Sequence, residues 1–281
     1  LRVRRRRAAL PASPDRYAVL TAGRNEGNVI AGLLAPLAAQ TYDMSLVTVF
    51  VAADNCADST AAIARAHGAV VYERFNHVNV GKGYALDFLL QHIGADYPEG
   101  FDGYFVFDAD NLLSPDYIQR MNETFSAGHE IVTSYRNSKN FGDNWISAGY
   151  SIFLLREATQ LNRARMMFGT SSCVSGNGFL CSSEIARENG GWKHFLLPED
   201  FEFTVDRNLK DDTVCYCENA IIYDEQPTRL GQSFMQRARW IKGYLQVFSR
   251  YGFKMLKKTV VDGSFACFDM IMNNIPCLVL T

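Results

Sequence analysis

Two aspartates, Asp108 and Asp110, follow directly after the short apolar run of residues 104–107. That run is typical of a buried strand, and the alternation of side chains along an extended chain sends both carboxylates to the same side. Open α/β sheets bind ligands at the carboxyl ends of their strands. Two carboxylates there suit Mg²⁺ or Mn²⁺, which take few protein ligands and complete their shell with phosphate oxygens and water. An isolated pair is more often a solvated turn, but the position at a strand end favours a metal site.

Asp54 follows another long apolar run, residues 46–53, of the kind expected for a strand buried on both faces. A carboxylate at such a position can accept hydrogen bonds from a ribose or a nucleobase. Turn formation explains the polar residues around it equally well. Both interpretations of Asp54 stay open.

The tripeptide Gly81-Lys82-Gly83 combines glycines, which let the backbone approach a ligand, with a lysine that can meet a phosphate as a point charge. The spacing of a P-loop, GxxxxGK followed by Ser or Thr, is absent. The tripeptide is therefore a candidate phosphate contact, and a P-loop NTPase is excluded.

Glu199 and Asp200 precede a helical pattern at residues 201–209. Acids in the first turn of a helix commonly serve only to complement its dipole. A general base benefits from a raised pKa, whereas a helix N-terminus lowers the pKa of a carboxylate. A structural role and a catalytic role for this pair both stay open.

Gln236, Arg239 and Trp240 lie at i, i+3 and i+4 in a helical stretch at residues 230–250, which places them on one face. Arginine can bind a diphosphate through two hydrogen bonds, glutamine adds a neutral donor, and tryptophan offers an apolar plate for a sugar. As an isolated pattern, this face is more often structural.

The elements that must position these residues follow a strand, turn, helix rhythm, which predicts an α/β fold with a largely parallel sheet covered by helices. Apolar runs predict strands at 17–21, 46–53, 70–73, 104–107 and 131–134, with further strand segments at 174–180 and 214–223. Helical spacing and capping signals predict helices at 29–39, 84–93, 114–128, 144–166, 201–209 and 230–250. The core is expected to be one domain.

Composition is that of an ordinary folded protein: 281 residues, 48% hydrophobic, with a net charge of −2. This charge gives no reason to expect a nucleic-acid partner. The seven scattered cysteines support neither a disulfide framework nor a zinc site, and a reducing cytosol is the simplest setting.

The two ends of the chain differ from the middle. Arginines crowd residues 2–7, as in a solvated tail or a segment next to a membrane. Residues 265–281 are apolar but interrupted by polar side chains, too short and too polar to span a bilayer alone. We expect these residues to form either a last core helix or an interfacial helix that leads into a membrane span. On the second interpretation, the protein lies at the cytoplasmic face of the cell membrane and contacts lipids. Its full-length form would then be an integral membrane protein.

Taken in order, these motifs resemble those of the family-2 inverting glycosyltransferases of GT-A fold. The motifs are Ala22-Gly23-Arg24-Asn25-Glu26, Asp54, Gly81-Lys82-Gly83, Asp108-Ala109-Asp110, Glu199-Asp200 and Gln236-Arg-Ala-Arg239-Trp240. The likeness is greatest to the membrane-associated branch with the cellulose, chitin, hyaluronan and poly-N-acetylglucosamine synthases. It implies a Rossmann-like, mixed and mostly parallel sheet flanked by helices, followed by C-terminal amphipathic helices.

The resemblance also implies a role for each motif residue. Donor contacts would come from Glu26, Asp54, Lys82, Asp108, Gly176, Gln236 and Arg239, and acceptor contacts from Glu199 and Trp240. Asp108 and Asp110 would hold Mg²⁺ or Mn²⁺, and Asp200 would be the catalytic base. The implied domains are a basic juxtamembrane tail at 1–14, a catalytic domain at 15–229, and a segment at 230–281 with the Gln-x-x-Arg-Trp helix, an interfacial helix and the start of a membrane segment.

The implied activity is the transfer of a sugar from a nucleotide-diphosphate sugar, such as a UDP-hexose or UDP-N-acetylhexosamine, to a saccharide or lipid-linked acceptor, with polysaccharide synthesis as one outcome. Three alternatives stay open. They are a non-processive transfer of single sugars, a sugar-nucleotide sensor or scaffold without turnover, and a nucleotidyltransferase, although the last would not require the Gln236/Arg239/Trp240 face.

Overall fold

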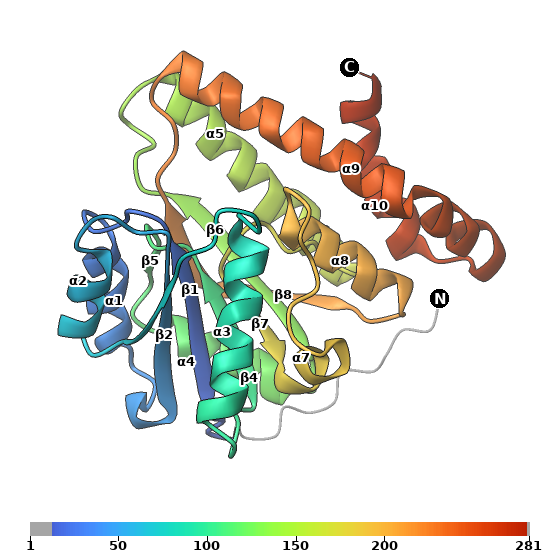
Figure 1. The fold of residues 1–281 in the computed structure, drawn as a ribbon. Helices are drawn as coiled ribbons and strands as arrows, with labels where there is room; N and C mark the ends of the chain where they lie inside the picture. Colours follow the sequence, from blue (N-terminus) through green and yellow to red (C-terminus); the bar gives the residue numbers. More distant parts are fainter. Residues whose placement is uncertain (1–12, 280–281) are drawn as a thin grey trace.

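Eight strands form a single sheet in the computed structural model, which describes residues 13–279 (Figure 1). The strands are β1 (Tyr17–Gly23), β2 (Val47–Asp54), β3 (Val70–Arg74), β4 (Gly103–Phe107), β5 (Leu112–Leu113), β6 (Ile131–Ser138), β7 (Phe179–Ser182) and β8 (Val214–Asp224). Their order across the sheet is β3-β2-β1-β4-β7-β6-β8-β5. The expected mixed α/β sheet flanked by helices is confirmed.

Helices cover both faces of this sheet and extend beyond it (Figure 1). They are α1 (Ile30–Ala38), α2 (Thr60–Ala66), α3 (Lys82–Asp96), α4 (Tyr117–Ser126), α5 (Trp145–Arg156), α6 (Arg163–Met167), α7 (Ser183–Asn189), α8 (Glu199–Leu209), α9 (Leu230–Asp262) and α10 (Phe265–Val279). A short 3₁₀ turn, η1 (Met44–Leu46), precedes β2, and a π-helix, η2 (Glu157–Asn162), joins α5 to α6.

The apolar runs form strands because their side chains are buried on both faces of the sheet. In β1, Ala18 and Leu20 pack with residues of α3, whereas Tyr17 and Val19 pack with residues of α1 and α4. The same alternation holds along β4, where Val106 and Phe107 belong to opposite clusters. Two apolar layers therefore hold the sheet between its covering helices.

Strand direction determines where the polar side chains gather. Strands β1, β2, β3 and β4 are parallel to one another, and β6 and β8 are parallel to each other. Because β7 is antiparallel to both β4 and β6, the six strands β1, β2, β3, β4, β6 and β8 share one direction. Their carboxyl ends, and the segment that enters β7, therefore lie along one edge of the sheet.

The C-terminal helices α9 and α10 pack on α8 (Figure 1). Phe201 and Val205 of α8 share an apolar cluster with Val247 and Met255 of α9 and Met270 of α10. This cluster fixes the start of α8, which carries Glu199 and Asp200.

The prediction of an integral protein at the cytoplasmic face of a membrane is wrong for the residues that the structure describes. Within 13–279, no helix is both long and apolar enough to cross a bilayer. The 33-residue α9 is long but charged, and α10 is held to the domain by an ion pair of 2.6 Å between Asp269 and Arg165. The expected tail at 1–14 falls almost wholly outside the described residues.

Candidate active site

Lys82 lies at the centre of the candidate site, at the first residue of α3. Its Nζ donates to Asp108 Oδ1 at 2.6 Å and to the Gly176 carbonyl oxygen at 2.8 Å, and it lies 3.8 Å from Glu199 Oε1. Burial disfavours the charge of Lys82, but the carboxylates of Asp108 and Glu199 outweigh burial and raise its pKa. One lysine thus joins three segments that are far apart in the sequence.

Gly83 explains how α3 comes so close to the segment before α8. A Cβ at this position would collide with the carbonyl oxygen of His194. Only glycine permits this approach of helix to backbone. The glycine therefore helps to bring Lys82 within reach of Glu199.

Asp108 follows the last residue of β4, and each of its carboxylate oxygens accepts a hydrogen bond. Its second carboxylate oxygen accepts from Asn177 Nδ2 at 2.9 Å, and its backbone N–H donates to Asn111 Oδ1 at 2.9 Å. Burial opposes ionisation of Asp108, but the charge and hydrogen bond of Lys82 prevail and lower its pKa. Asp108 is therefore an anion held in a fixed position.

Asp110 differs from Asp108 because its carboxylate has no salt bridge among residues 13–279. Burial, followed by the negative charges of Asp108 and Asp224, raises its pKa to about 6. Lys139 Nζ donates to the backbone carbonyl oxygen of Asp110, and its charge partly opposes this rise. A divalent cation would relieve this accumulation of negative charge, and hard carboxylate oxygens suit Mg²⁺ or Mn²⁺.

The donor set for a metal is small. Within the described residues, no group of three or more His, Cys, Asp or Glu side chains could hold a metal ion. Two carboxylates fit a cation whose remaining ligands are diphosphate oxygens and water. Asp110 is the better placed of the pair, because both oxygens of Asp108 already accept hydrogen bonds.

Asp224 and Arg136 belong to the site but escape the sequence analysis. Asp224 ends β8 and is 3% exposed, and it accepts hydrogen bonds from Arg136 Nε, from Asn111 Nδ2 at 2.5 Å and from Asn177 Nδ2 at 3.2 Å. The signal was available, because Asp224 follows the strand segment expected at 214–223, as Asp54 and Asp108 follow their expected strands.

Asp200 accepts a hydrogen bond from the Gly176 N–H, and Gly176 adopts a left-handed φ of 80° that aims this donor. Burial raises the pKa of Asp200, against the backbone donors that lower it. Burial also raises the pKa of the neighbouring Glu199 to about 7, with Lys82 opposing and Asp200 reinforcing the shift. Burial therefore outweighs the helix N-terminus, and both acids have the raised pKa that a general base requires.

A further acid, Glu157, lies behind this loop and was also missed by the sequence analysis. It begins the π-helix η2 and accepts from Ser175 Oγ at 3.3 Å. Arg136 Nη1 donates to Ser175 as well, to its carbonyl oxygen at 3.2 Å. Burial raises the pKa of Glu157 while Arg136 lowers it. These contacts fix the loop whose Gly176 binds Asp200.

Asp54 and Glu26 occupy the part of the edge near β1 and β2. Asp54 is buried and pairs with Arg74 at 2.7 Å, and Arg74 in turn donates to the Asn79 carbonyl oxygen at 2.6 Å. Asp54 therefore anchors the segment that leads to Lys82. Burial, then the negative charges of Asp108 and Asp58, raises the pKa of Glu26.

Gln236, Arg239 and Trp240 all lie on α9. Trp240 packs edge-on against Tyr150 of α5, with ring centroids 5.9 Å apart. Arg239 is exposed, and Gln236 Oε1 is buried with no hydrogen-bond partner among residues 13–279. No hydrogen bond or ion pair in the described part of the chain joins these three side chains to the carboxylate cluster.

Acidic side chains gather at the carboxyl edge of this mixed α/β sheet, which is where such sheets bind their ligands. Residues 14–243 match the family described as "Glycosyltransferase like family 2". This match covers most of the chain, which therefore belongs to that family.

Curated relatives show a consistent but distant likeness. The chain is 24% identical over 239 residues to the Beta-monoglucosyldiacylglycerol synthase of Synechocystis sp., which covers 83% of this chain and 48% of the relative. The enzyme of the same name from Trichormus variabilis is 24% identical over 269 residues, with 93% and 55% covered. The chain spans about half the length of these relatives.

Solved structures share the fold at low sequence identity. The mannosyltransferase PcManGT from Pyrobaculum calidifontis, in complex with GDP-Man and Mn²⁺, has a TM-score of 0.66 at 15% identity, covering 97% of this chain and 76% of that one. S. aureus TarS in complex with UDP-GlcNAc has a TM-score of 0.60 at 15% identity, covering 86% and 66%.

Proposed function

We propose that this chain transfers a hexosyl or N-acetylhexosaminyl group from a nucleoside-diphosphate sugar to a hydroxyl group of a saccharide or lipid-linked acceptor, with inversion at the anomeric carbon. The observation that carries the proposal is the convergence of Asp108, Glu199 and Asp200 on Lys82 at one edge of the sheet. The comparisons support it, since one relative is named Beta-monoglucosyldiacylglycerol synthase and two solved structures of similar fold are complexes with GDP-Man and UDP-GlcNAc.

Asp200 is the proposed base. Its carboxylate accepts the proton of the acceptor hydroxyl as that oxygen attacks the anomeric carbon. The new carbon–oxygen bond forms on the face opposite the diphosphate, and the bond from the anomeric carbon to the diphosphate oxygen breaks. The Gly176 N–H holds the Asp200 carboxylate in place while its raised pKa favours proton uptake.

Positive charges stabilise the leaving diphosphate in this proposal. Lys82 lies among the acids of the site, and the exposed Arg239 has no ion pair within residues 13–279, so it is available to bind a phosphate. A well-placed donor of this kind contributes about 3 to 4 kcal/mol to transition-state stabilisation. A divalent metal, when bound by Asp110 with Asp108, supplies further positive charge to the diphosphate.

The experiment is a panel of UDP- and GDP-sugars with Mn²⁺ or Mg²⁺, scored for release of the nucleoside diphosphate with saccharide and lipid acceptors. Release that depends on an acceptor supports the proposal. Donor binding without release under any condition would favour a sensor or scaffold. Stepwise lengthening of the product on a gel would separate polysaccharide synthesis from transfer of a single sugar.

A further inference from the structure

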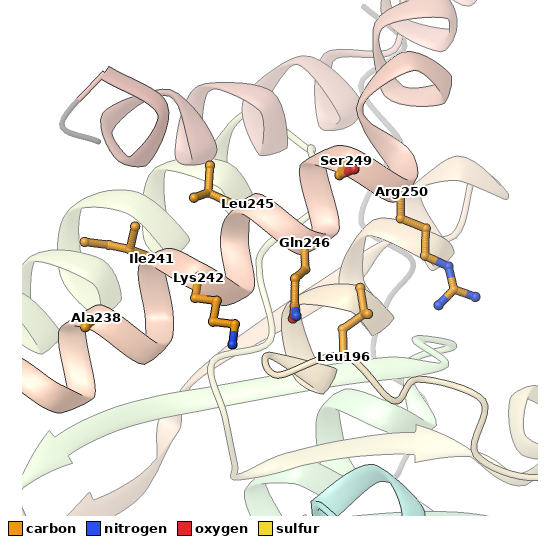
Figure 2. A pocket seen from close by; sticks show the side chains of 8 residues that line it. All are labelled: Leu196, Ala238, Ile241, Lys242, Leu245, Gln246, Ser249 and Arg250. Atoms are coloured by element: carbon orange, nitrogen blue, oxygen red, sulfur yellow. The ribbon is translucent and has the colours of Figure 1, made fainter.

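A groove of about 740 Å³ lies along α9, beside the loop that leads into α8 (Figure 2). This volume falls within the range of small-molecule sites, about 300 to 1,000 Å³. Ala238, Ile241 and Leu245 line it from α9, and Leu196 lines it from the loop. Figure 2 shows Leu196 pointing toward α9, on the side of the helix toward which Lys242 and Gln246 extend.

The groove lies beside the segment that carries Glu199 and Asp200. Gly243 of α9 packs directly on Pro198, because a Cβ at Gly243 would lie 2.6 Å from Pro198 Cδ. The Leu197 N–H donates to Gln246 Oε1 at 3.4 Å. Pro198 immediately precedes Glu199 and Asp200. The wall of the groove and the proposed base therefore belong to one short segment.

The chemistry of the lining favours a hydrocarbon chain over a sugar. Among the described residues that line the groove there is no aromatic ring and no carboxylate, so a sugar would find neither a stacking surface nor a strong acceptor there. Two cations lie at its rim. Arg250 is already paired with the buried Glu202 at 3.1 Å, whereas Lys242 has no ion pair in the part of the chain that the structure describes. Lys242 adjoins Gly243, so the available charge lies at the end near Pro198.

We infer that this groove binds the hydrocarbon chain of a lipid acceptor. The chain would lie against Ala238, Ile241, Leu245 and Leu196, the polar headgroup would lie near Lys242, and the headgroup hydroxyl would reach Asp200. This inference rests on the proposed function and narrows its acceptor to a lipid. The transfer itself is the one described above, with the proton passing to Asp200 and the nucleoside diphosphate leaving.

Direct binding tests the groove without a donor. The probe is cis-parinaric acid, a fluorescent fatty acid, titrated into the folded chain and displaced with 1-oleoylglycerol. Leu245→Arg places a charge in the groove, and Ala238→Trp fills it from an exposed position that tolerates a larger side chain. Leu256→Arg is the matched control, because Leu256 is exposed on the same helix outside the groove.

We expect saturable binding of one probe per chain, weakened about tenfold or more by Leu245→Arg and Ala238→Trp, since each removes apolar contact with the chain. Leu256→Arg should change the affinity less than about twofold, because it removes no contact in the groove. Thermal unfolding curves confirm that each variant is folded. Absence of saturable binding, or an equal loss in the control, overturns the inference.

Transfer assays separate this inference from the proposed function. With the donor found by the sugar-nucleotide panel, Leu245→Arg should raise the KM for 1-oleoylglycerol far more than the KM for 1-butyrylglycerol. Transfer to saccharides alone would overturn the lipid groove and leave the proposed function standing. Failure to release nucleoside diphosphate under any condition would overturn the proposed function, while the fatty-acid titration would still decide the groove.

Discussion

Lys82 Nζ lies 2.6 Å from Asp108 Oδ1, so the first residue of α3 is joined to the residue that follows β4. The same amine lies 3.8 Å from Glu199 at the start of α8. One cation therefore connects the proposed donor side of the site to the proposed acceptor side.

Replacement of this cation tests its role directly. Lys82→Gln removes positive charge from the proposed diphosphate site, and we expect kcat to fall roughly 10²- to 10³-fold. The control is Lys257→Gln, since Lys257 is exposed on α9. Steady-state kinetics with saturating donor would measure both. An equal, small effect of the two substitutions would remove Lys82 from the mechanism.

The acidic pair predicts the pH dependence of transfer. Burial raises the pKa of Glu199 to about 7, and that of Asp200 is raised as well. A base must be deprotonated to act, so the rate should fall as the pH drops through the raised pKa of Asp200, which lies above the ordinary carboxyl value. Lys82→Gln should move this acid limb to higher pH, because the Lys82 charge lowers the pKa of Asp200. A limb near pH 4, the ordinary value for a carboxyl group, would contradict the assignment.

Asp110 should control metal affinity. Asp110→Asn removes the carboxylate that has no salt bridge in the described chain, and we expect Mn²⁺ binding in the presence of nucleoside diphosphate to weaken about tenfold or more. Titration calorimetry would measure this. Asp116→Asn is a suitable control, because Asp116 pairs with Arg120 at the start of α4. Unchanged affinity in Asp110→Asn would place the metal elsewhere.

Replacing Gly83 should lower the stability of the fold, whereas replacing Gly94 on the same helix should not. Gly83→Ala would force a Cβ into the His194 carbonyl, and we expect the free energy of unfolding to fall by about 1 to 3 kcal/mol. Gly94→Ala, on the open side of α3, should instead raise it by up to about 1 kcal/mol. Urea unfolding measures the free energy of unfolding of both variants. Equal changes in the two would contradict the close contact between α3 and the His194 carbonyl.

Much of the fold can be predicted from the sequence where local pattern and burial agree. The runs at residues 46–53 and 104–107 are apolar because strands β2 and β4 are covered on both faces, and their positions were predicted to within a residue or two. The helix expected at 144–166 is helical throughout but contains the π-helix η2, which apolar spacing does not reveal. The segment expected to be a strand from 174 adopts β structure only from Phe179, because glycines at 176 and 178 take left-handed φ values.

The sequence predicts the site residues that belong to a recognisable local motif, but not those that reach the site only through the tertiary fold. Lys82, Asp108, Glu199 and Asp200 were predicted from type and position, and the structure brings them together. Arg136 and Glu157 come from segments without a local signal, and only the tertiary fold brings them to the Ser175 loop. Roles for the individual site residues stay predictions.

The most direct test of the proposed mechanism is a comparison of donor binding and transfer in Asp200→Asn. The asparagine oxygen can still accept the Gly176 hydrogen bond but cannot take up a proton. We therefore predict an unchanged dissociation constant for the donor, with a transfer rate reduced roughly 10²- to 10⁴-fold. Normal turnover in Asp200→Asn would contradict the account.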